Sequence, residues 1–183
     1  MSEPASARPT PERFVEVFGI IHDVIERRWG IPVVITDVAN PFTGDLDGAQ
    51  IKIDYDLTAE DSLFIITHLF GHTAQWNTSE AARRWGHYKG PFTDDVIAEI
   101  RAYEHEACQF SMQLFHEAGV HDLDQWLSDF SACDFAYLEH FYRAGKTGDF
   151  RSFWRDGTPL LAPKPIPAFT PQQWLGRWDG IVV

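Results

Sequence analysis

Two histidines, His68 and His72, lie four residues apart in the segment ITHLFGHTAQW (residues 66–76), which is otherwise rich in apolar residues. Side chains at positions i and i+4 share one face of an α-helix, so both imidazoles could bind one metal ion. Zinc enzymes with this spacing usually read His-Glu-x-x-His, in which the Glu is the general base, but Leu69 follows the first histidine here. The pattern leaves three interpretations open: a metal site that has lost its base, a metal site for other chemistry, and two histidines of the core.

A second predicted helix supplies a candidate third ligand. In residues 97–115, Glu104 is the one acid on a stripe of apolar and small residues, whereas Glu106 lies on the opposite, polar face. Carboxylates are rarely buried unless they are paired or bind a metal. Glu104 is therefore a candidate ligand, and the alternative is a salt bridge to Arg101 or to an arginine of another element.

Two imidazoles and one carboxylate form a three-ligand set with open positions, which is typical of catalytic rather than structural metal sites. The set suits Zn(II) and equally suits Fe(II) as a 2-His-1-carboxylate triad. We therefore predict one divalent transition metal, Fe(II) or Zn(II), at His68, His72 and Glu104. Tyr103 and Cys108 flank Glu104 and are candidate catalytic groups beside the ligands; core packing is the alternative for both.

The elements that must position these residues follow from hydrophobic periodicity and capping signals. Four main helices are expected, beginning near residues 10, 58, 94 and 122 or 124, and ending near residues 30, 76, 118 and 145. Two β-rich stretches, residues 31–39 and 49–57, flank a turn-rich segment and predict a hairpin or two neighbouring strands. The expected fold class is α+β, mostly helical with a small β-sheet or hairpin.

The chain is predicted to form one metal-binding domain over residues 10–183, after a polar, Pro-rich leader at residues 1–9 that we expect to be disordered. Residues 146–183 contain five Pro and three Trp, a composition that favours an ordered C-terminal wrap over a free tail.

Composition narrows the classes of partner. The formal net charge is −12 and basic residues form no cluster, which disfavours nucleic-acid and anionic-membrane partners. Aromatic residues make up 14% of the chain and could line a pocket for a small organic substrate. The sequence contains no apolar signal segment, no apolar run of membrane-spanning length and only two cysteines, so we expect a cytoplasmic protein. Protein partners are left open.

Over residues 48–118 the order of elements resembles the ImmA/IrrE-type metallopeptidase domain, a gluzincin-like family. In that family a β-rich segment precedes a helix reading HELGHxxxH, and a later helix reading E-x-x-A-[ND]-x-F-A-x-x-L-L supplies the third ligand. The resemblance implies a zincin-like metallopeptidase core in which His68, His72 and Glu104 bind the metal. Gly71 matches the family's glycine between the two histidines.

The sequence departs from the family pattern at three positions. Leu69 replaces the base Glu, Cys108 replaces the Asn or Asp, and Glu117 replaces the usual Pro. A zinc peptidase uses the Glu to take a proton from metal-bound water, so its loss argues against ordinary peptide hydrolysis.

Three functions are consistent with these residues. The favoured one is a metalloenzyme that acts on a small organic substrate by oxidative non-haem iron chemistry, an oxidoreductase rather than a hydrolase, because Leu69 makes the site drier. The second is a zinc hydrolase whose base comes from elsewhere, such as His87, His105 or an acid in residues 77–95. The third is an inactive, peptidase-like binding module.

Overall fold

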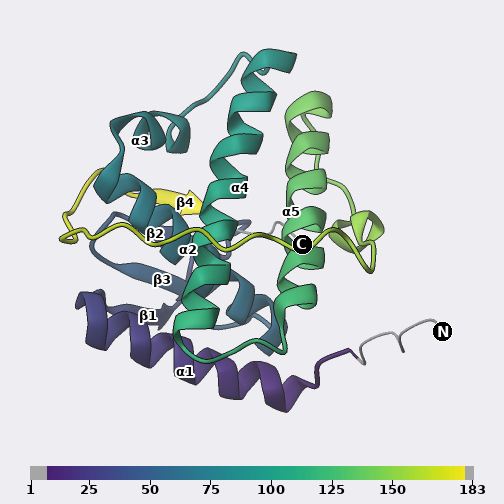
Figure 1. Ribbon diagram of the computed structural model, residues 1–183. Helices are drawn as coiled ribbons and strands as arrows, with labels where there is room; N and C mark the ends of the chain where they lie inside the picture. The colour runs from purple at the N-terminus through teal and green to yellow at the C-terminus, as the bar shows by residue number, and fades with distance from the viewer. Residues whose placement is uncertain (1–7, 180–183) are drawn as a thin grey trace.

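The computed structural model describes residues 8–179 and has an α+β fold, as the sequence predicts, with four long helices and a small mixed sheet (Figure 1). Residues 1–7, which hold most of the predicted leader, and residues 180–183 lie outside the described residues. The helices are α1 (Pro11–Trp29), α2 (Ala59–Thr78), α3 (Glu80–Gly86), α4 (Asp94–Glu117), α5 (Asp124–Ala144) and the 3-10 helix η1 (Phe150–Phe153); the strands are β1 (Val33–Thr36), β2 (Gly44–Leu46), β3 (Ile51–Asp54) and β4 (Arg177–Asp179).

The sheet has the strand order β1-β3-β2-β4. Strands β1 and β3 are the two predicted strands, and they pair in parallel. Strand β2 lies inside the turn-rich segment and pairs antiparallel with β3 and with β4, which comes from the C-terminal part of the chain. The sequence did not predict β2 or β4, because a strand of three residues is too short to show an alternating pattern and is defined by its backbone pairing.

Local capping explains where the long helices begin and end. The side chains of Thr10, Thr58 and Thr93 each accept a hydrogen bond from the backbone N–H three residues further on, at the start of α1, α2 and α4. Helices α1 and α5 end at Gly30 and Gly145, which adopt the left-handed conformation with φ of 66° and 64°. These signals are local, which is why the predicted boundaries agree with the structure to within about two residues.

Helix α2 is the central element of the fold. Its residues 63–76 are all buried, and it packs against α1, α4 and the sheet (Figure 1). Phe70 packs on Trp29 of α1 with ring centroids 4.6 Å apart, and Phe64 stacks on Phe130 of α5 at 4.0 Å. A helix that is buried on every side carries its polar side chains into the interior, where each needs a hydrogen-bond or metal partner.

Helices α2 and α4 are in close contact at Gly71. A Cβ atom at this position would lie 2.2 Å from the backbone oxygen of Ala107, so only glycine fits here without a shift of the α4 backbone. Glu104 lies one turn before Ala107 on α4. The close contact therefore brings Glu104 to the face of α2 that carries His68 and His72.

The chain after α5 returns across the helices. Residues 155–176, which contain no helix or strand, run across α4 and α5 and lead to β4 (Figure 1). The amide of Gln109 on α4 donates to the backbone oxygen of Ala162, and the backbone N–H of Trp174 donates to Asp47 next to β2. This segment therefore joins the surface of α4 to the far edge of the sheet.

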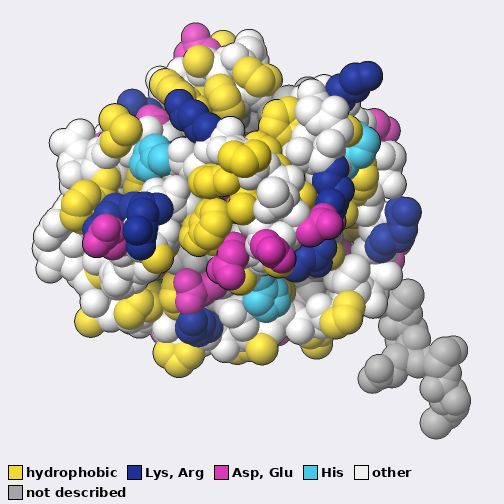
Figure 2. Space-filling view, turned by 90° about the horizontal axis from the view of Figure 1, so that it is seen from above, with side chains coloured by type: hydrophobic (Ala, Val, Ile, Leu, Met, Phe, Trp, Pro, Cys, Tyr) yellow, Lys and Arg dark blue, Asp and Glu magenta, His cyan; other side chains and the backbone are white. Residues whose placement is uncertain are grey.

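None of the described helices combines the length and the apolar character that crossing a membrane requires. On the face of the molecule seen in Figure 2, Lys and Arg side chains lie beside Asp and Glu rather than in one continuous basic patch.

Replacing Gly71 with Ala is expected to lower the free energy of unfolding by about 1–3 kcal/mol or more, because the added methyl group meets backbone rather than a movable side chain. Gly19→Ala is the matched control: nothing lies within 4 Å of a Cβ at that exposed position in α1. The control should raise the free energy by about 0.5–1 kcal/mol through helix propensity. Urea denaturation followed by circular dichroism measures both, and equal effects would contradict the close contact.

Candidate metal centre

The structure brings the three predicted ligands together in the interior. Nε2 of His72 lies 3.0 Å from Oε2 of Glu104 and 3.1 Å from Nε2 of His68, and Nε2 of His68 lies 3.3 Å from the same carboxylate oxygen. The three residues are 0–3% exposed. Of the alternative partners considered for Glu104, Arg101 instead binds Glu139 at 2.6 Å, whereas an arginine of another element, Arg177 on β4, lies 3.9 Å from Oε1 of Glu104. The three donor atoms thus converge on one point between α2 and α4, as a metal site requires.

The other ring nitrogen of His72 is held by Gln75, one turn further along α2. Nδ1 of His72 lies 2.9 Å from Oε1 of Gln75, whose amide nitrogen donates to the backbone oxygen of Tyr103 and to Oε2 of Glu106, each at 2.9 Å. Both of these partners accept only, so the amide must point its nitrogen at them and its oxygen at His72. His72 therefore carries its proton on Nδ1 and directs the lone pair of Nε2 at Glu104.

His68 has a comparable neighbour on α4. The thiol of Cys108 lies 3.7 Å from Nδ1 of His68. Metal-binding histidines usually form a hydrogen bond through the ring nitrogen that does not face the metal, because this bond fixes the ring and its tautomer. Gln75 and Cys108 do this for the two imidazoles, so both Nε2 atoms face Glu104.

The electrostatics of the cluster favour an ionised carboxylate. Burial would raise the pKa of Glu104, but the two imidazoles outweigh burial and hold its pKa well below the usual value. Burial lowers the pKa of His72, which agrees with a neutral ring. Burial also opposes the charged form of His68, but Cys108 and Glu104 together raise its pKa well above the usual value. The ionised carboxylate thus pairs with a protonated His68, and a bound cation would replace the positive charge of that imidazole.

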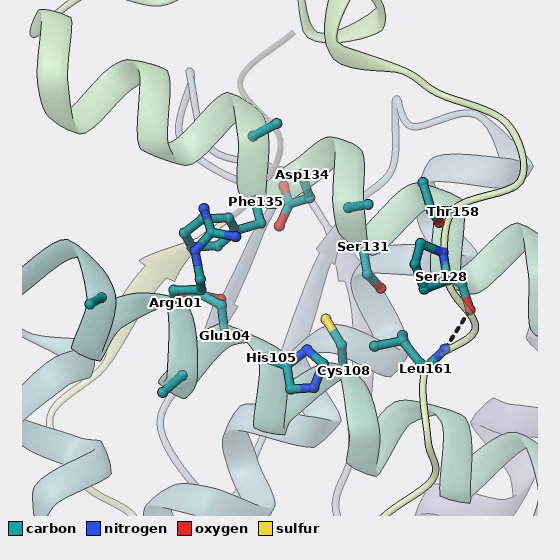
Figure 3. Close-up of a pocket in the computed structure, with 15 residues that line it drawn as sticks. Arg101, Glu104, His105, Cys108, Ser128, Ser131, Asp134, Phe135, Thr158 and Leu161 are labelled. Atoms are coloured by element: carbon teal, nitrogen blue, oxygen red, sulfur yellow. Dashed lines mark hydrogen bonds between the residues drawn. The ribbon is translucent and has the colours of Figure 1, made fainter.

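A cavity of about 600 Å³ lies beside the cluster, between α4 and α5 (Figure 3). Glu104 and Cys108 form part of its α4 wall, and Ser131 and Asp134 extend from α5 on the opposite side. The cavity also has apolar surfaces from alanines of both helices and from Phe135. Its size falls in the range of small-molecule sites, and it reaches a predicted metal ligand directly.

Tyr103 lies on another side of the cluster. Its ring stacks on His72 with centroids 4.5 Å apart, and its hydroxyl accepts from Trp76 Nε1 at 3.0 Å and from Arg177 at 3.2 Å. Arg177, on β4, also lies 3.9 Å from Oε1 of Glu104, so the two oxygens of this carboxylate face different groups. Tyr103 is thus held in a buried network and is absent from the described wall of the cavity, which Cys108 lines.

Leu69 fills space between α2 and the sheet. It is fully buried, and its Cδ1 would lie 2.6 Å from a Cβ built at Gly44 of β2. The position that holds the base in the resembled family is therefore occupied here by a side chain that packs under β2. A carboxylate at this position would enter an apolar environment.

The displaced bases considered from the sequence lie in different places. Both ring nitrogens of His87 face backbone oxygens, those of Arg83 at 2.9 Å and Leu175 at 3.2 Å. His105 is exposed and lines the same cavity as Glu104. Among the proposed replacements, His105 is therefore the one that shares the cavity with a candidate ligand.

Sequence reasoning did not assign roles to Gln75, Arg177 or Asp134. Gln75 was recognisable in principle, because it lies one turn after His72 on the same helical face. Arg177 lies more than 70 residues from Glu104 in the chain and reaches it only because β4 pairs with β2. Asp134 shares a cavity with Glu104 only because α4 packs beside α5.

Comparison with protein-family models, curated proteins and solved structures gives no match to this chain. The family resemblance inferred from the sequence therefore stays a prediction, and the functional inference depends on the geometry of the site.

Gln75→Ala should weaken metal binding by about 10–100-fold without unfolding the chain, because it removes the hydrogen bond that orients His72. Gln113→Ala is the control, since Gln113 is on α4 and its amide donates to Glu117 at 2.9 Å. Calorimetric titration of the chelator-treated proteins with Zn²⁺ or Fe²⁺ measures the metal affinity of each variant. Equal affinities in the two variants would contradict the orienting role of Gln75.

Proposed function

We propose that this chain is a mononuclear metalloenzyme. His68 and His72 through their Nε2 atoms, and Glu104 through Oε2, would hold one divalent transition metal, Fe(II) or Zn(II). A small organic substrate would occupy the cavity between α4 and α5 that Glu104 lines. The observation that carries the proposal is the convergence of three buried donor atoms from two helices, 3.0–3.3 Å apart.

The distribution of protons supports a cation at this point. Gln75 requires the proton of His72 on Nδ1, so Nε2 of His72 presents a lone pair 3.0 Å from Oε2 of Glu104. Acceptor atoms repel one another unless a proton or a cation lies between them. A proton on Nε2 of His68 forms a hydrogen bond between only two of these atoms at a time. A metal ion binds all three donor atoms at once.

The surroundings of the site favour small-molecule chemistry over peptide hydrolysis. The residue after His68 is an apolar side chain that packs under β2, so α2 offers no base at the position where a zinc peptidase has one. Fe(II) in such a site supplies redox chemistry with open coordination positions, whereas Zn(II) supplies a Lewis acid. Ser131 and Asp134 offer polar groups opposite Glu104 that could orient a substrate of moderate size.

One distance favours a second candidate, thiol-dependent chemistry without a metal. Cys108 Sγ lies 3.7 Å from Nδ1 of His68, whose Nε2 lies 3.3 Å from Glu104, so the three groups follow the order of a Cys-His-carboxylate triad. Cys108 also lines the cavity. In this alternative His68 would act as a base towards the thiol instead of as a metal ligand.

The metal content of protein purified anaerobically, without a histidine tag and after dialysis against a weak chelator, tests the first proposal. We expect each of His68→Ala, His72→Ala and Glu104→Gln to bind one metal ion fewer per chain than the wild type. His105→Ala is the matched control and should retain the metal, because His105 lines the cavity but lies outside the cluster. Iron would favour oxidative chemistry, and zinc would favour a hydrolase. A metal content equal to that of the wild type in all three ligand variants would refute the proposal.

Thiol labelling at pH 8 tests the environment of the two cysteines. Burial raises the pKa of Cys133 to about 12, so this thiol stays protonated and should not react. A small alkylating reagent that enters the cavity should therefore modify Cys108, and Cys108→Ser should abolish labelling while Cys133→Ser leaves it unchanged. Labelling that is fast in chelator-treated protein and blocked by bound metal would favour the metal site. Labelling of Cys133 instead would show that the cavity does not admit the reagent to Cys108.

A further inference from the structure

A second group of metal-binding side chains lies where α4 connects to α5. Nε2 of His116 lies 2.9 and 3.0 Å from the two carboxylate oxygens of Asp124. The rings of His116 and His121 have centroids 4.5 Å apart. One donor atom from each of the three residues lies within 4.8 Å of the others, a spacing that a single metal ion can bridge.

The backbone that carries these residues is held on both sides. The N–H of Ala118 donates to Leu114 at 3.0 Å, and the N–H of Val120 donates to Phe115 at 2.9 Å. Val120 and Leu123 anchor the connection in the core, where each is 1% exposed. The backbone that carries the three donors is therefore held in place before a ligand binds, which lowers the entropic cost of binding.

The neighbouring acidic side chains form ion pairs elsewhere, so they do not compete with the three donors for a cation. Asp122 binds Arg13 at 2.8 and 2.9 Å, and Glu117 binds Arg28, so these two acids are engaged outside the cluster. The C-terminal end of a helix attracts positive charge, and His116 lies in the last turn of α4. Among the described residues, α5 begins with no side-chain cap, so a bridge to α4 would brace this end of the helix.

We propose that His116, His121 and Asp124 form a second site for Zn²⁺ or a similar divalent transition metal, which joins the end of α4 to the start of α5. Two imidazoles and one carboxylate suit this class of ion and leave a position for water. His116 is twelve residues beyond Glu104 on the same helix, about 18 Å away at the rise of an α-helix, so the two sites are separate. Because α4 and α5 form the walls of the cavity, an ion here would brace the two helices at one end of it.

Zinc titration of chelator-treated protein by calorimetry tests the second site independently of the first. We expect two zinc ions per wild-type chain and one in Glu104→Gln, where only the second site remains. His121→Ala should remove one ion from the wild-type chain and weaken binding to Glu104→Gln by at least about tenfold, since one of three ligands is lost. Zinc should raise the melting temperature of Glu104→Gln, and adding the His121→Ala substitution to that variant should abolish this rise.

His140→Ala is the matched control, because His140 is exposed on α5 and lies outside the cluster. Asp124→Asn is a second variant that should weaken zinc binding while keeping a residue of similar size at the start of α5. The inference is overturned if Glu104→Gln binds no zinc, or if His121→Ala and His140→Ala weaken binding equally. If only the proposed site at His68, His72 and Glu104 were wrong, the wild-type chain and Glu104→Gln would each bind one zinc ion.

Discussion

The close contact between α2 and α4 at Gly71 brings together the three side chains of the candidate metal centre. A side chain at this position would meet the backbone of Ala107, and backbone cannot move aside as a flexible side chain can. With the helices this close, Glu104 on α4 reaches two imidazoles that lie one turn apart on α2. Around the same contact His72 is fully buried, because α2 is buried along its length.

Burial of α2 in turn requires partners for its polar side chains, and other elements supply them in two chains of contacts. One runs from Lys164 through Glu106 and Gln75 to His72, and it determines which nitrogen of the imidazole carries the proton. The other links Arg177 on β4 to Tyr103, whose ring stacks on His72. The segment after α5 therefore takes part in the site, although it is far from α2 in the sequence.

Helix α4 is the element that both proposed sites share. Its buried face carries Glu104 and Cys108 towards α2 and the cavity, and its last turn carries His116 towards the start of α5. Substrate binding in the cavity and metal binding at the helix connection would both depend on how α4 and α5 pack. Substrate binding would change with the width of the cavity. Metal binding at the second site would change with the geometry of the connection between α4 and α5.

The sequence by itself determined the α+β class, the four long helices with their threonine and glycine caps, and the three side chains that meet at the candidate centre. These features depend on local signals: helical periodicity, capping residues, and an acid on an otherwise apolar helix face. The structure alone decided that β2 and β4 complete the sheet, that Arg101 binds Glu139 instead of Glu104, and that Arg177 and Asp134 lie beside the site, whereas Gln75 lies one helical turn after His72 and could be recognised from the sequence. These relations join residues that are one helical turn to more than 70 positions apart, and the distant ones form only when α2, α4, α5 and the C-terminal segment pack together, because no local pattern encodes which surfaces meet.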